Sequence, residues 1–418
     1  MTFPDPVAIP AGLRLTDWIR PGDSVVWGQA AAEPEALTSA LVAQRHAVGP
    51  VTATIGLSLT ATTDPAHADR LRFRSYCASG TNRRLAQAGA LEILPVPYST
   101  LSRILAPVDV LMLHLPPPRP DGLHNLGLVN EWLAPLIDSA RVVLAEVNDR
   151  MPDVPGDIAV RPERLAAVVR SARPLRSLDS APPSDIDRRI AAHVCGLIED
   201  GSVLQIGLGQ LPDAILGGLR DRRDLGVHSG LISDGIAALT EAGVITNARK
   251  TRDRGVTVTG WLLGGERLWR FAHRNPGLRL CPTSYTHDPA VLSGHDRLVA
   301  INSAIEVDLT GQINAEVADG AYIGAVGGAA EFLRGAHGSR GGLPIVALAS
   351  TVRRTGASRI VARLSGPVST PRSEAGIIVT EHGIADLRGC TLAERRRRMI
   401  DIADPAQRAA LDAAPPLP

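Results

Sequence analysis

Short apolar runs alternate along this chain with longer stretches in which apolar residues recur at helical spacing. In the first unit, a predicted strand at residues 24–27 leads through a glycine turn into a helix that begins at Pro34, a residue type favoured in the first turn of helices. Alternating strand and helix patterns are typical of parallel sheets covered by helices. The pattern therefore predicts an α/β fold, with further strands at 51–59, 108–115 and 140–147 and a helix at 161–172.

A segment rich in proline, serine and alanine, residues 173–184, follows this series and is the predicted linker. A second series comes after it, with helices at 185–198 and 212–219 and strands at 203–206, 256–259, 298–302, 345–348 and 377–380. The 418 residues of the chain exceed the roughly 250–300 residues at which one hydrophobic core stops growing. We therefore expect two domains, at 1–178 and 185–418.

The charge balance argues against nucleic acid and membrane surfaces as partners. The chain has 44 basic and 43 acidic residues, a net charge of +1, which gives no broad attraction to phosphate backbones or anionic lipid. Four cysteines, at positions 77, 195, 281 and 390, form no C-x-x-C pair, and the first residues lack a charged start followed by an apolar run. These features favour a cytoplasmic protein without a membrane span.

Lysine is almost absent: Lys250 is the only lysine in the sequence. Codon bias in a GC-rich genome explains the skew towards arginine. The one lysine that remains is then conspicuous, because a compact ammonium placed against a ligand is not replaced by arginine. Lys250 is therefore a candidate functional residue, with a solvated loop charge as the alternative.

A glycine turn, Gly207-Leu208-Gly209-Gln210, lies between the predicted strand at 203–206 and the following helix. Such a turn leaves backbone amides exposed at a helix N-terminus, where partial positive charge gathers. The turn could therefore bind an oxyanion, although a lone G-x-G also serves merely to pack a strand and a helix closely together.

Several segments in both halves resemble the acetyl-CoA hydrolase/transferase family, in particular its 4-hydroxybutyrate and butyrate CoA-transferases. The resemblance is carried by residues 22–28, 113–117, 143–148, 200–209, 244–250, 302–312 and 379–389, in this order. It implies two Rossmann-like open α/β domains of the CoA-transferase superfamily and an acyl-CoA or CoA ligand, with a small carboxylate as cosubstrate in transferases. It also implies a homo-oligomer such as a homodimer, no metal, and no cofactor beyond CoA as part of the substrate.

The resemblance also assigns the ligand-binding positions. It makes Leu208 and Gly209 the oxyanion-binding residues of the turn. The predicted CoA-binding residues are Gly207 and Gln210 in that turn and Val326, Gly327 and Gly328 in a second glycine cluster.

Gly230 stands where transferases of this family carry their nucleophilic glutamate, so the usual covalent exchange lacks its attacking group. The vacated space could admit water beside the oxyanion site, which would turn exchange into hydrolysis. His228 would share the face of a strand with position 230 and has the intrinsic pKa of a base. Asn247, Lys250 and Glu306 complete the predicted catalytic set.

Thioester hydrolysis is thus the favoured reading, and three alternatives stay open. Another glutamate, one of Glu306, Glu316 and Glu381, could act as the nucleophile of a true CoA-transferase. The space could instead hold a cyclic ketone CoA thioester whose C–C bond is hydrolysed, with His228, Asn247 and Lys250 polarising the ketone. Finally, the protein could bind an acyl-CoA without turning it over.

Overall fold

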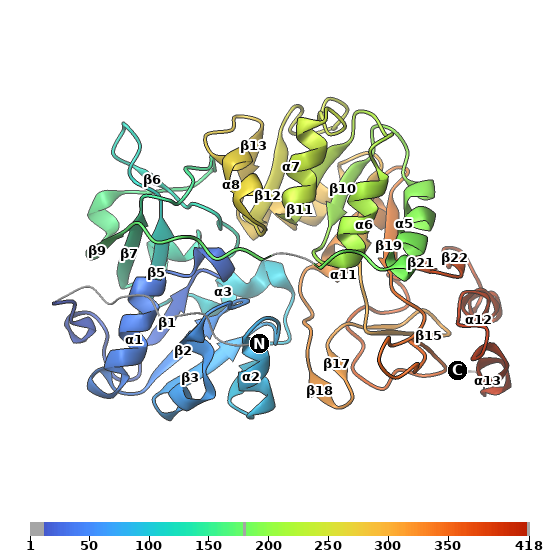
Figure 1. Cartoon of the computed structure of the whole chain (residues 1–418), viewed down its shortest axis with the longest axis horizontal. Helices are drawn as coiled ribbons and strands as arrows, with labels where there is room; N and C mark the ends of the chain where they lie inside the picture. Colours follow the sequence, from blue (N-terminus) through green and yellow to red (C-terminus); the bar gives the residue numbers. More distant parts are fainter. Residues whose placement is uncertain (1–11, 179–180, 416–418) are drawn as a thin grey trace. The chain divides into compact units, whose positions relative to one another are not determined.

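The computed structural model describes residues 12–178 and 181–415, and the chain forms two compact units (Figure 1). Unit 1 contains the chain up to Leu178 together with residues 260–285 and 321–327, and unit 2 contains the rest. The chain first leaves unit 1 within the predicted linker, of which residues 179–180 lie outside the described residues. The two later segments that group with unit 1 had no counterpart in the sequence pattern.

Unit 1 is built on a seven-stranded sheet in the order β4-β3-β2-β1-β5-β7-β9, in which every neighbouring pair is parallel. The strands are β1 (Ser24–Trp27), β2 (Val51–Ile55), β3 (Leu71–Ser75), β4 (Leu91–Ile93), β5 (Val110–Leu115), β7 (Val142–Asn148) and β9 (Ala167–Ser171). The chain order reverses between β1 and β5. In open α/β sheets the carboxyl ends of strands at such a reversal form the usual ligand crevice.

The predicted helix at 161–172 is wrong. The structure has the short strand β8 (Ala159–Val160), a single 3-10 turn (Pro162–Arg164) and then β9. Residues Val168 and Val169 explain the difference, because β-branched side chains favour strands over helices, and their alternating burial is that of an edge strand exposed on one face.

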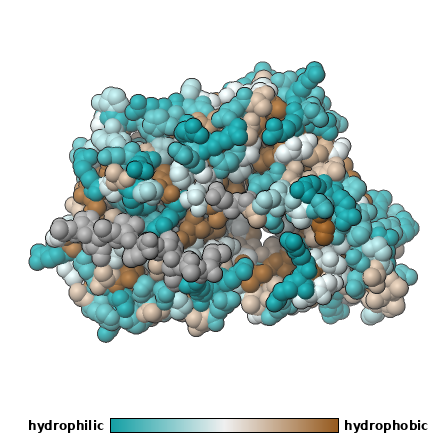
Figure 2. Space-filling model, in the orientation of Figure 1, coloured by the Kyte–Doolittle hydropathy of each residue, from teal (hydrophilic) through white to brown (hydrophobic). Residues whose placement is uncertain are grey.

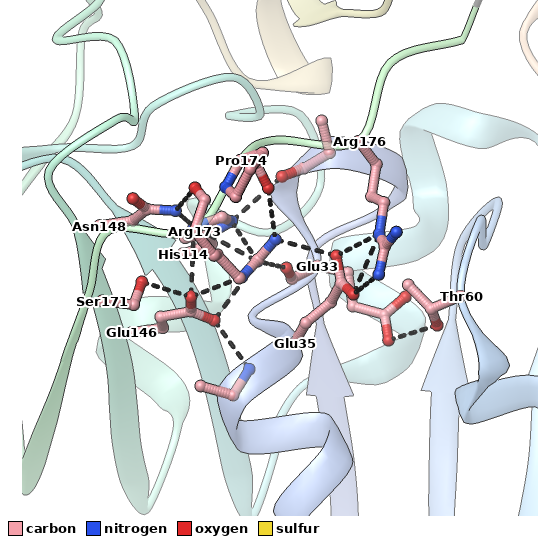
Figure 3. Close-up of polar contacts among 12 residues, drawn as sticks. Glu33, Glu35, Thr60, His114, Glu146, Asn148, Ser171, Arg173, Pro174 and Arg176 are labelled. Carbon is pink, nitrogen blue, oxygen red and sulfur yellow. Dashed lines mark hydrogen bonds and ion pairs between the residues drawn. The ribbon is translucent and has the colours of Figure 1, made fainter. Parts of the chain in front are cut away.

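The first part of the predicted linker is anchored on unit 1 by ion pairs (Figure 3). Arg173 contacts the carboxylates of Glu146 and Glu35 at 2.7 and 2.9 Å, and Arg176 contacts Glu35 at 2.7 Å. Glu35 begins helix α1 (Glu35–Val48), while Glu146 lies on β7. Buried charges are stable only when paired in this way, so the segment that leaves β9 is fastened to the sheet rather than loose.

Unit 1 is completed by short elements. They are α2 (Asn82–Gln87), α3 (Leu101–Leu105), α4 (Leu136–Ser139), α8 (Glu266–Ala272) and the strand β6 (His124–Asn125), which pairs with β8. One hydrophobic cluster of its core joins α1 to both halves of the sheet and includes Leu37, Leu41, Phe73 and Met112.

Unit 2 contains most of an eight-stranded sheet in the order β13-β12-β11-β10-β14-β19-β21-β22. The strands are β10 (Val203–Ile206), β11 (Gly226–Ile232), β12 (Thr257–Leu262), β13 (Leu278–Leu280), β14 (Leu298–Asn302), β19 (Leu343–Ala347), β21 (Ile377–Thr380) and β22 (Gly383–Asp386). The pairs β11-β10-β14-β19-β21 are parallel and β22 is antiparallel. Here the chain order reverses between β10 and β14, which places the expected crevice at the carboxyl end of β10.

Helices flank this sheet, and unit 2 has a hydrophobic core of its own. The helices are α5 (Asp185–Leu197), α6 (Gln210–Gly218), α7 (Asp234–Glu241), α10 (Pro289–Ser293), α11 (Ala329–Gly338), α12 (Leu392–Asp401) and α13 (Arg408–Ala413), with α9 (Thr283–Thr286) at the passage between the units. A small sheet, β16 (Ile313–Asn314), β15 (Glu306–Asp308) and β20 (Ile360–Val361), and the pair β17 (Val317–Ala318) and β18 (Ala321–Tyr322) complete the chain. The predicted α/β fold is therefore confirmed.

The face of the molecule in Figure 2 is mainly hydrophilic, with hydrophobic residues scattered over it, as is normal for a protein surface. Among residues 12–178 and 181–415, no helix is long and apolar enough to cross a membrane.

Candidate active site

The carboxyl ends of β10 and β11 bring the predicted glycine turn and Gly230 side by side. The printed register pairs Val203 with Gly226 and Leu204 with Val227. Continued along two parallel strands, this register places Gly207 level with Gly230, and the hydroxyl of Ser229 donates to Ile206 O at 3.4 Å. Both glycines therefore lie at the end of the sheet where the reversal of strand order predicts a ligand.

The turn has the backbone of an anion-binding site. Gly209 caps helix α6 with φ of 115°, a conformation that only glycine adopts readily. No side chain caps this helix, and a Cβ built on Gly207 or Gly209 would meet no atom within 4 Å. There is thus open space beside Gly207 and Gly209 at the start of α6. The side chain of Gln210 donates to Pro182 O at 3.1 Å.

The space beside Gly230 is not empty, which corrects the expectation of a glutamate-sized void. A Cβ built on Gly230 would lie 3.1 Å from Cε1 and 3.3 Å from Nε2 of His287, and 3.4 Å from Cε2 of Phe332. The first of these distances is tighter than nine in ten real Cβ contacts. A side chain at position 230 would therefore begin in tight contact with the ring of His287, which would have to move by a few tenths of an ångström.

His287 is held firmly in this place. Its Nδ1 lies 2.8 Å from the hydroxyl of Thr286, and its ring packs against that of Phe332 with centroids 4.6 Å apart. The side chain is 3% exposed, and burial lowers its pKa to about 3. The imidazole is therefore neutral at neutral pH.

His228 lies deeper on β11 and is completely buried. Its Nε2 lies 3.1 Å from Thr286 O and its Nδ1 lies 3.2 Å from Nε2 of His295. Burial, followed by the charges of His295 and Lys250, lowers its pKa well below the usual value. These contacts give His228 a clear structural role, while its predicted role as a base stays a prediction.

Asn247 and Lys250 both form hydrogen bonds with the backbone of Val227 on β11. Asn247 accepts from Val227 N at 2.8 Å, and Lys250 Nζ donates to Val227 O at 2.8 Å and to Val256 O at 2.7 Å. Lys250 is 1% exposed, so the alternative of a solvated loop charge is wrong. Asn247 and Lys250 thus contact β11 at Val227, three residues before Gly230, and His228 is the next residue of the strand.

Three possible metal ligands lie close together in the same region. Donor atoms of His228, Asp253 and His295 all lie within 4.8 Å of one another. The positive charge of Lys250, however, contributes to lowering the pKa of both histidines. A charge that disfavours an imidazolium at this place also disfavours a metal cation, so the donor set fits a metal poorly.

The three glutamates considered as alternative nucleophiles are all engaged by loops. Glu306 accepts from Ser365 N at 2.6 Å and from Gly366 N at 3.1 Å, and Glu381 accepts from the amide and hydroxyl of Ser350 at 2.9 and 2.7 Å. Glu316 accepts from a serine hydroxyl, that of Ser369, at 2.7 Å. The predicted catalytic role of Glu306 stays a prediction.

The residues of the second glycine cluster are assigned to different units. Val326 and Gly327 belong to unit 1, and Gly328 precedes α11 in unit 2. In unit 1, Gly327 O accepts from Tyr98 N at 3.2 Å. Tyr98 in turn belongs to a buried polar network that sequence reasoning missed.

This network lies beyond the carboxyl end of β1. The carboxylate of Glu131 accepts from Gln29 Nε2 at 2.6 Å and from the Tyr98 hydroxyl at 2.8 Å, and the Tyr76 hydroxyl donates to Gln29 Oε1 at 2.8 Å. Burial raises the pKa of Glu131 to about 8, and its φ of 36° is uncommon for a residue other than glycine. Strained, buried, titratable residues cluster at functional sites.

Comparison with known proteins agrees with these features. A family model described as the acetyl-CoA hydrolase/transferase N-terminal domain matches residues 14–177, and one described as the C-terminal domain matches residues 264–414. The chain is 34% identical over 395 residues to the 4-hydroxybutyrate coenzyme A transferase of Clostridium kluyveri, covering 93% of this chain and 92% of that protein.

Two further similarities concern an enzyme of different activity and a solved structure. The chain is 30% identical over 259 residues to an acetyl-CoA hydrolase of Saccharomyces cerevisiae, covering 58% of this chain and 48% of that protein. The crystal structure of RipA from Yersinia pestis matches with a TM-score of 0.88 at 30% identity, covering 94% of this chain and 93% of that chain.

Proposed function

Because the chain belongs to the acetyl-CoA hydrolase/transferase family, whose members are CoA-transferases and acetyl-CoA hydrolases, we propose that it hydrolyses an acyl-CoA thioester. Water would attack the thioester carbonyl directly, without an acyl-glutamyl intermediate. The amides of Leu208 and Gly209 at the start of α6 would stabilise the oxyanion, since preorganised donors of this kind supply the largest single term in many acyl transfers.

One observation carries this proposal: Gly230, at the carboxyl end of β11, faces the imidazole of His287 instead of presenting a carboxylate. Ping-pong CoA exchange needs a nucleophile beside the oxyanion site. Glu306, Glu316 and Glu381 each accept hydrogen bonds from serine groups of loops. Hydrolysis requires no such carboxylate.

The test is incubation of the purified protein with a panel of acyl-CoA thioesters in water enriched in oxygen-18. We expect release of free CoA thiol without any added carboxylate, one labelled oxygen in the acid product, and no protein-bound CoA after borohydride treatment. Exchange that depends on added acetate, together with a trapped glutamyl-CoA, would establish a transferase instead.

The same experiment separates the remaining alternatives. Tight binding of CoA esters with no loss of thioester absorbance would identify a binding protein. Ring opening of a cyclic ketone substrate with the thioester intact would identify a C–C bond hydrolase. A cytoplasmic location and a homodimer stay predictions, which cell fractionation and light scattering can check.

A further inference from the structure

The two strands on either side of the chain reversal in unit 2 are joined by a pair of side-chain amides. Asn302 Nδ2, at the end of β14, donates to Gln205 Oε1 on β10 at 3.0 Å, and Gln205 Nε2 donates back to Asn302 Oδ1 at 3.4 Å. Gln205 is 5% exposed, while Asn302 is half-buried. The buried glutamine therefore holds the more exposed asparagine by both polar atoms of its amide.

The register of the sheet places Asn302 in one row with the two glycines of the site. Ile206 is level with Ile301 in the parallel pairing of β10 and β14, so the next residues, Gly207 and Asn302, are level too. Gly207 is in turn level with Gly230 on β11 when the register of that pair is continued. Level residues of parallel strands share a face of the sheet, so Asn302 lies beside two positions that have no side chain.

Asn302 borders the open space beside the glycine turn. Neighbouring strands lie about 4.8 Å apart, and a Cβ built on Gly207 would meet no atom within 4 Å. A primary amide has two N–H donors, of which Asn302 uses one towards Gln205. The second N–H lies outside the ring of the two amides and is available to a group above Gly207, next to the amides that begin α6.

We propose that Asn302 is an additional oxyanion donor of this enzyme and that Gln205 positions it. This inference rests on the proposed thioester hydrolysis. When water adds to the thioester carbonyl carbon, the π electron pair of the C=O bond moves to the oxygen, and the Asn302 amide donates to that oxygen together with the backbone amides of the turn. Collapse of the adduct re-forms the C=O bond and breaks the C–S bond. One proton of the water stays with the carboxylic acid and the other goes to the CoA sulfur.

Preorganisation is the physical reason for the pair. A freely rotating carboxamide has to be oriented at the moment of reaction, whereas an amide fixed by two hydrogen bonds is already aligned when charge develops. The residues level with the pair are small, with Ala300 beside Gln205 and Gly207 beside Asn302. They leave the room in which the two longer side chains meet diagonally across the strands.

Replacement of the asparagine tests its role in the full-length protein. Asn302→Leu has a side chain of similar size without a donor, so we expect kcat for acyl-CoA hydrolysis to fall by a factor of about 100 to 1,000, as for loss of one oxyanion donor, with little change in KM. Asn302→Asp should lose at least as much, because its carboxylate still accepts from Gln205 but repels the negative oxygen.

A double variant separates catalysis from packing. Asn302→Leu alone leaves the buried amide of Gln205 without its partner, whereas Asn302→Leu combined with Gln205→Leu replaces both amides by apolar side chains, which is nearly neutral for stability. We therefore expect the urea midpoint of the double variant to return towards that of wild-type protein while kcat stays low. Gln205→Leu alone keeps the donor but not its alignment, so its kcat should fall less than that of Asn302→Leu, again with little change in KM.

Gln407→Leu is the matched control, because it removes another half-buried amide of unit 2 and should retain kcat. Folding of each variant is checked by circular dichroism. If wild-type protein hydrolyses acyl-CoA but folded Asn302→Leu keeps its kcat, or if the double variant regains kcat together with stability, Asn302 is not an oxyanion donor while the proposed function stands. If wild-type protein releases no CoA from any thioester, the proposed function itself fails.

Discussion

Residues 230 and 287 share one small volume in unit 2, and this coupling leads to the first prediction. Gly230→Glu alone should give no CoA exchange with acetate, because even its Cβ meets His287 at 3.1 Å, and overpacking of this kind costs about 1–3 kcal/mol. Gly230→Glu combined with His287→Gly removes the obstructing ring. We expect the double variant to gain acetate-dependent exchange, measured by transfer of CoA to labelled acetate.

The controls for this pair are the single variants Gly230→Glu and His287→Gly, together with Gly230→Ala. Gly230→Ala adds only the Cβ, which the ring of His287 can accommodate by a shift of a few tenths of an ångström, so it should lose less stability to urea than Gly230→Glu. If Gly230→Glu alone gave as much CoA exchange as the double variant, the ring of His287 would not obstruct a glutamate at position 230.

Lys250 leads to a second prediction, because its buried ammonium holds two backbone carbonyls of unit 2, Val227 O and Val256 O. Lys250→Met leaves both carbonyls without this donor, and a buried acceptor left unsatisfied costs about 1–3 kcal/mol. We expect a corresponding drop in the free energy of unfolding, measured by urea titration. Arg249→Met, whose exposed side chain pairs with Asp224, should change it by less than about 1 kcal/mol.

At the scale of elements, the start of α6 gives a third prediction. Gly209→Ala forces a Cβ into a backbone with φ of 115°, which costs about 1–3 kcal/mol or turns the adjoining amides away. We expect kcat for acyl-CoA hydrolysis to fall by a factor of about 100, as for loss of one oxyanion donor. Steady-state kinetics with saturating substrate measures this effect.

Gly217→Ala is the matched control on the same helix. A Cβ at Gly217 meets no atom within 4 Å, and alanine is favoured over glycine inside helices by about 0.5–1 kcal/mol. This variant should therefore be slightly more stable than wild-type protein, with unchanged kcat. Equal loss of activity in both variants would mean that α6 matters as a whole rather than through its first amides.

The elements also show how far the sequence alone reaches. Buried parallel strands such as β1, β5 and β10 were predictable, since each is a short apolar run bounded by turn residues. The edge strand β9 was not, because Val168 and Val169 sit in a polar stretch whose period also suits a helix. The local sequence pattern does not show that the free edge of β7 is available to pair with this segment as a strand.

The site divides in the same way. The glycine turn at 207–210 and Gly230 stand out in the sequence, and parallel pairing of β10 and β11 explains why they meet. His287 does not stand out, because it lies 57 residues after Gly230 and only the tertiary fold brings its ring to β11. Glu131 was equally hidden, although a glutamate beside Trp132 in an otherwise apolar stretch was a signal that burial had to be considered.

At the scale of the whole molecule, buried titratable groups predict how stability depends on pH. The pKa is lowered by burial to about 3 for His114 and His287 and to about 4 for His295. The unfolded chain therefore binds more protons than the folded one as pH falls from about 6.5 towards 3. Stability that these histidines contribute near neutral pH is lost across this window.

Two buried glutamates of unit 1 act in the opposite direction. Burial raises the pKa of Glu33 to about 7 and that of Glu131 to about 8, so the folded chain keeps protons that the unfolded chain releases above about 4.5. Stability from these groups is complete below pH 4.5 and is lost as pH rises to about 8. Between about pH 4.5 and 6.5 the three histidines outweigh the two glutamates, so we expect the free energy of unfolding to rise up to about pH 6.5 and to fall above it.

Tryptophan fluorescence can assign the alkaline side of this profile to unit 1, because all five tryptophans, at positions 18, 27, 132, 261 and 269, belong to that unit. Urea midpoints followed by fluorescence should fall between pH 6.5 and 8, and Glu131→Gln, which leaves no carboxyl group to ionise, should flatten that fall. Glu163→Gln, at an exposed position, should not. Three of the histidines whose pKa is lowered, His228, His287 and His295, lie in unit 2. Far-ultraviolet circular dichroism reports both units, so the loss of stability below pH 6.5 should be larger by this measurement than by fluorescence. A fluorescence midpoint that rises steadily up to pH 8 would show that Glu33 and Glu131 ionise freely in the folded chain.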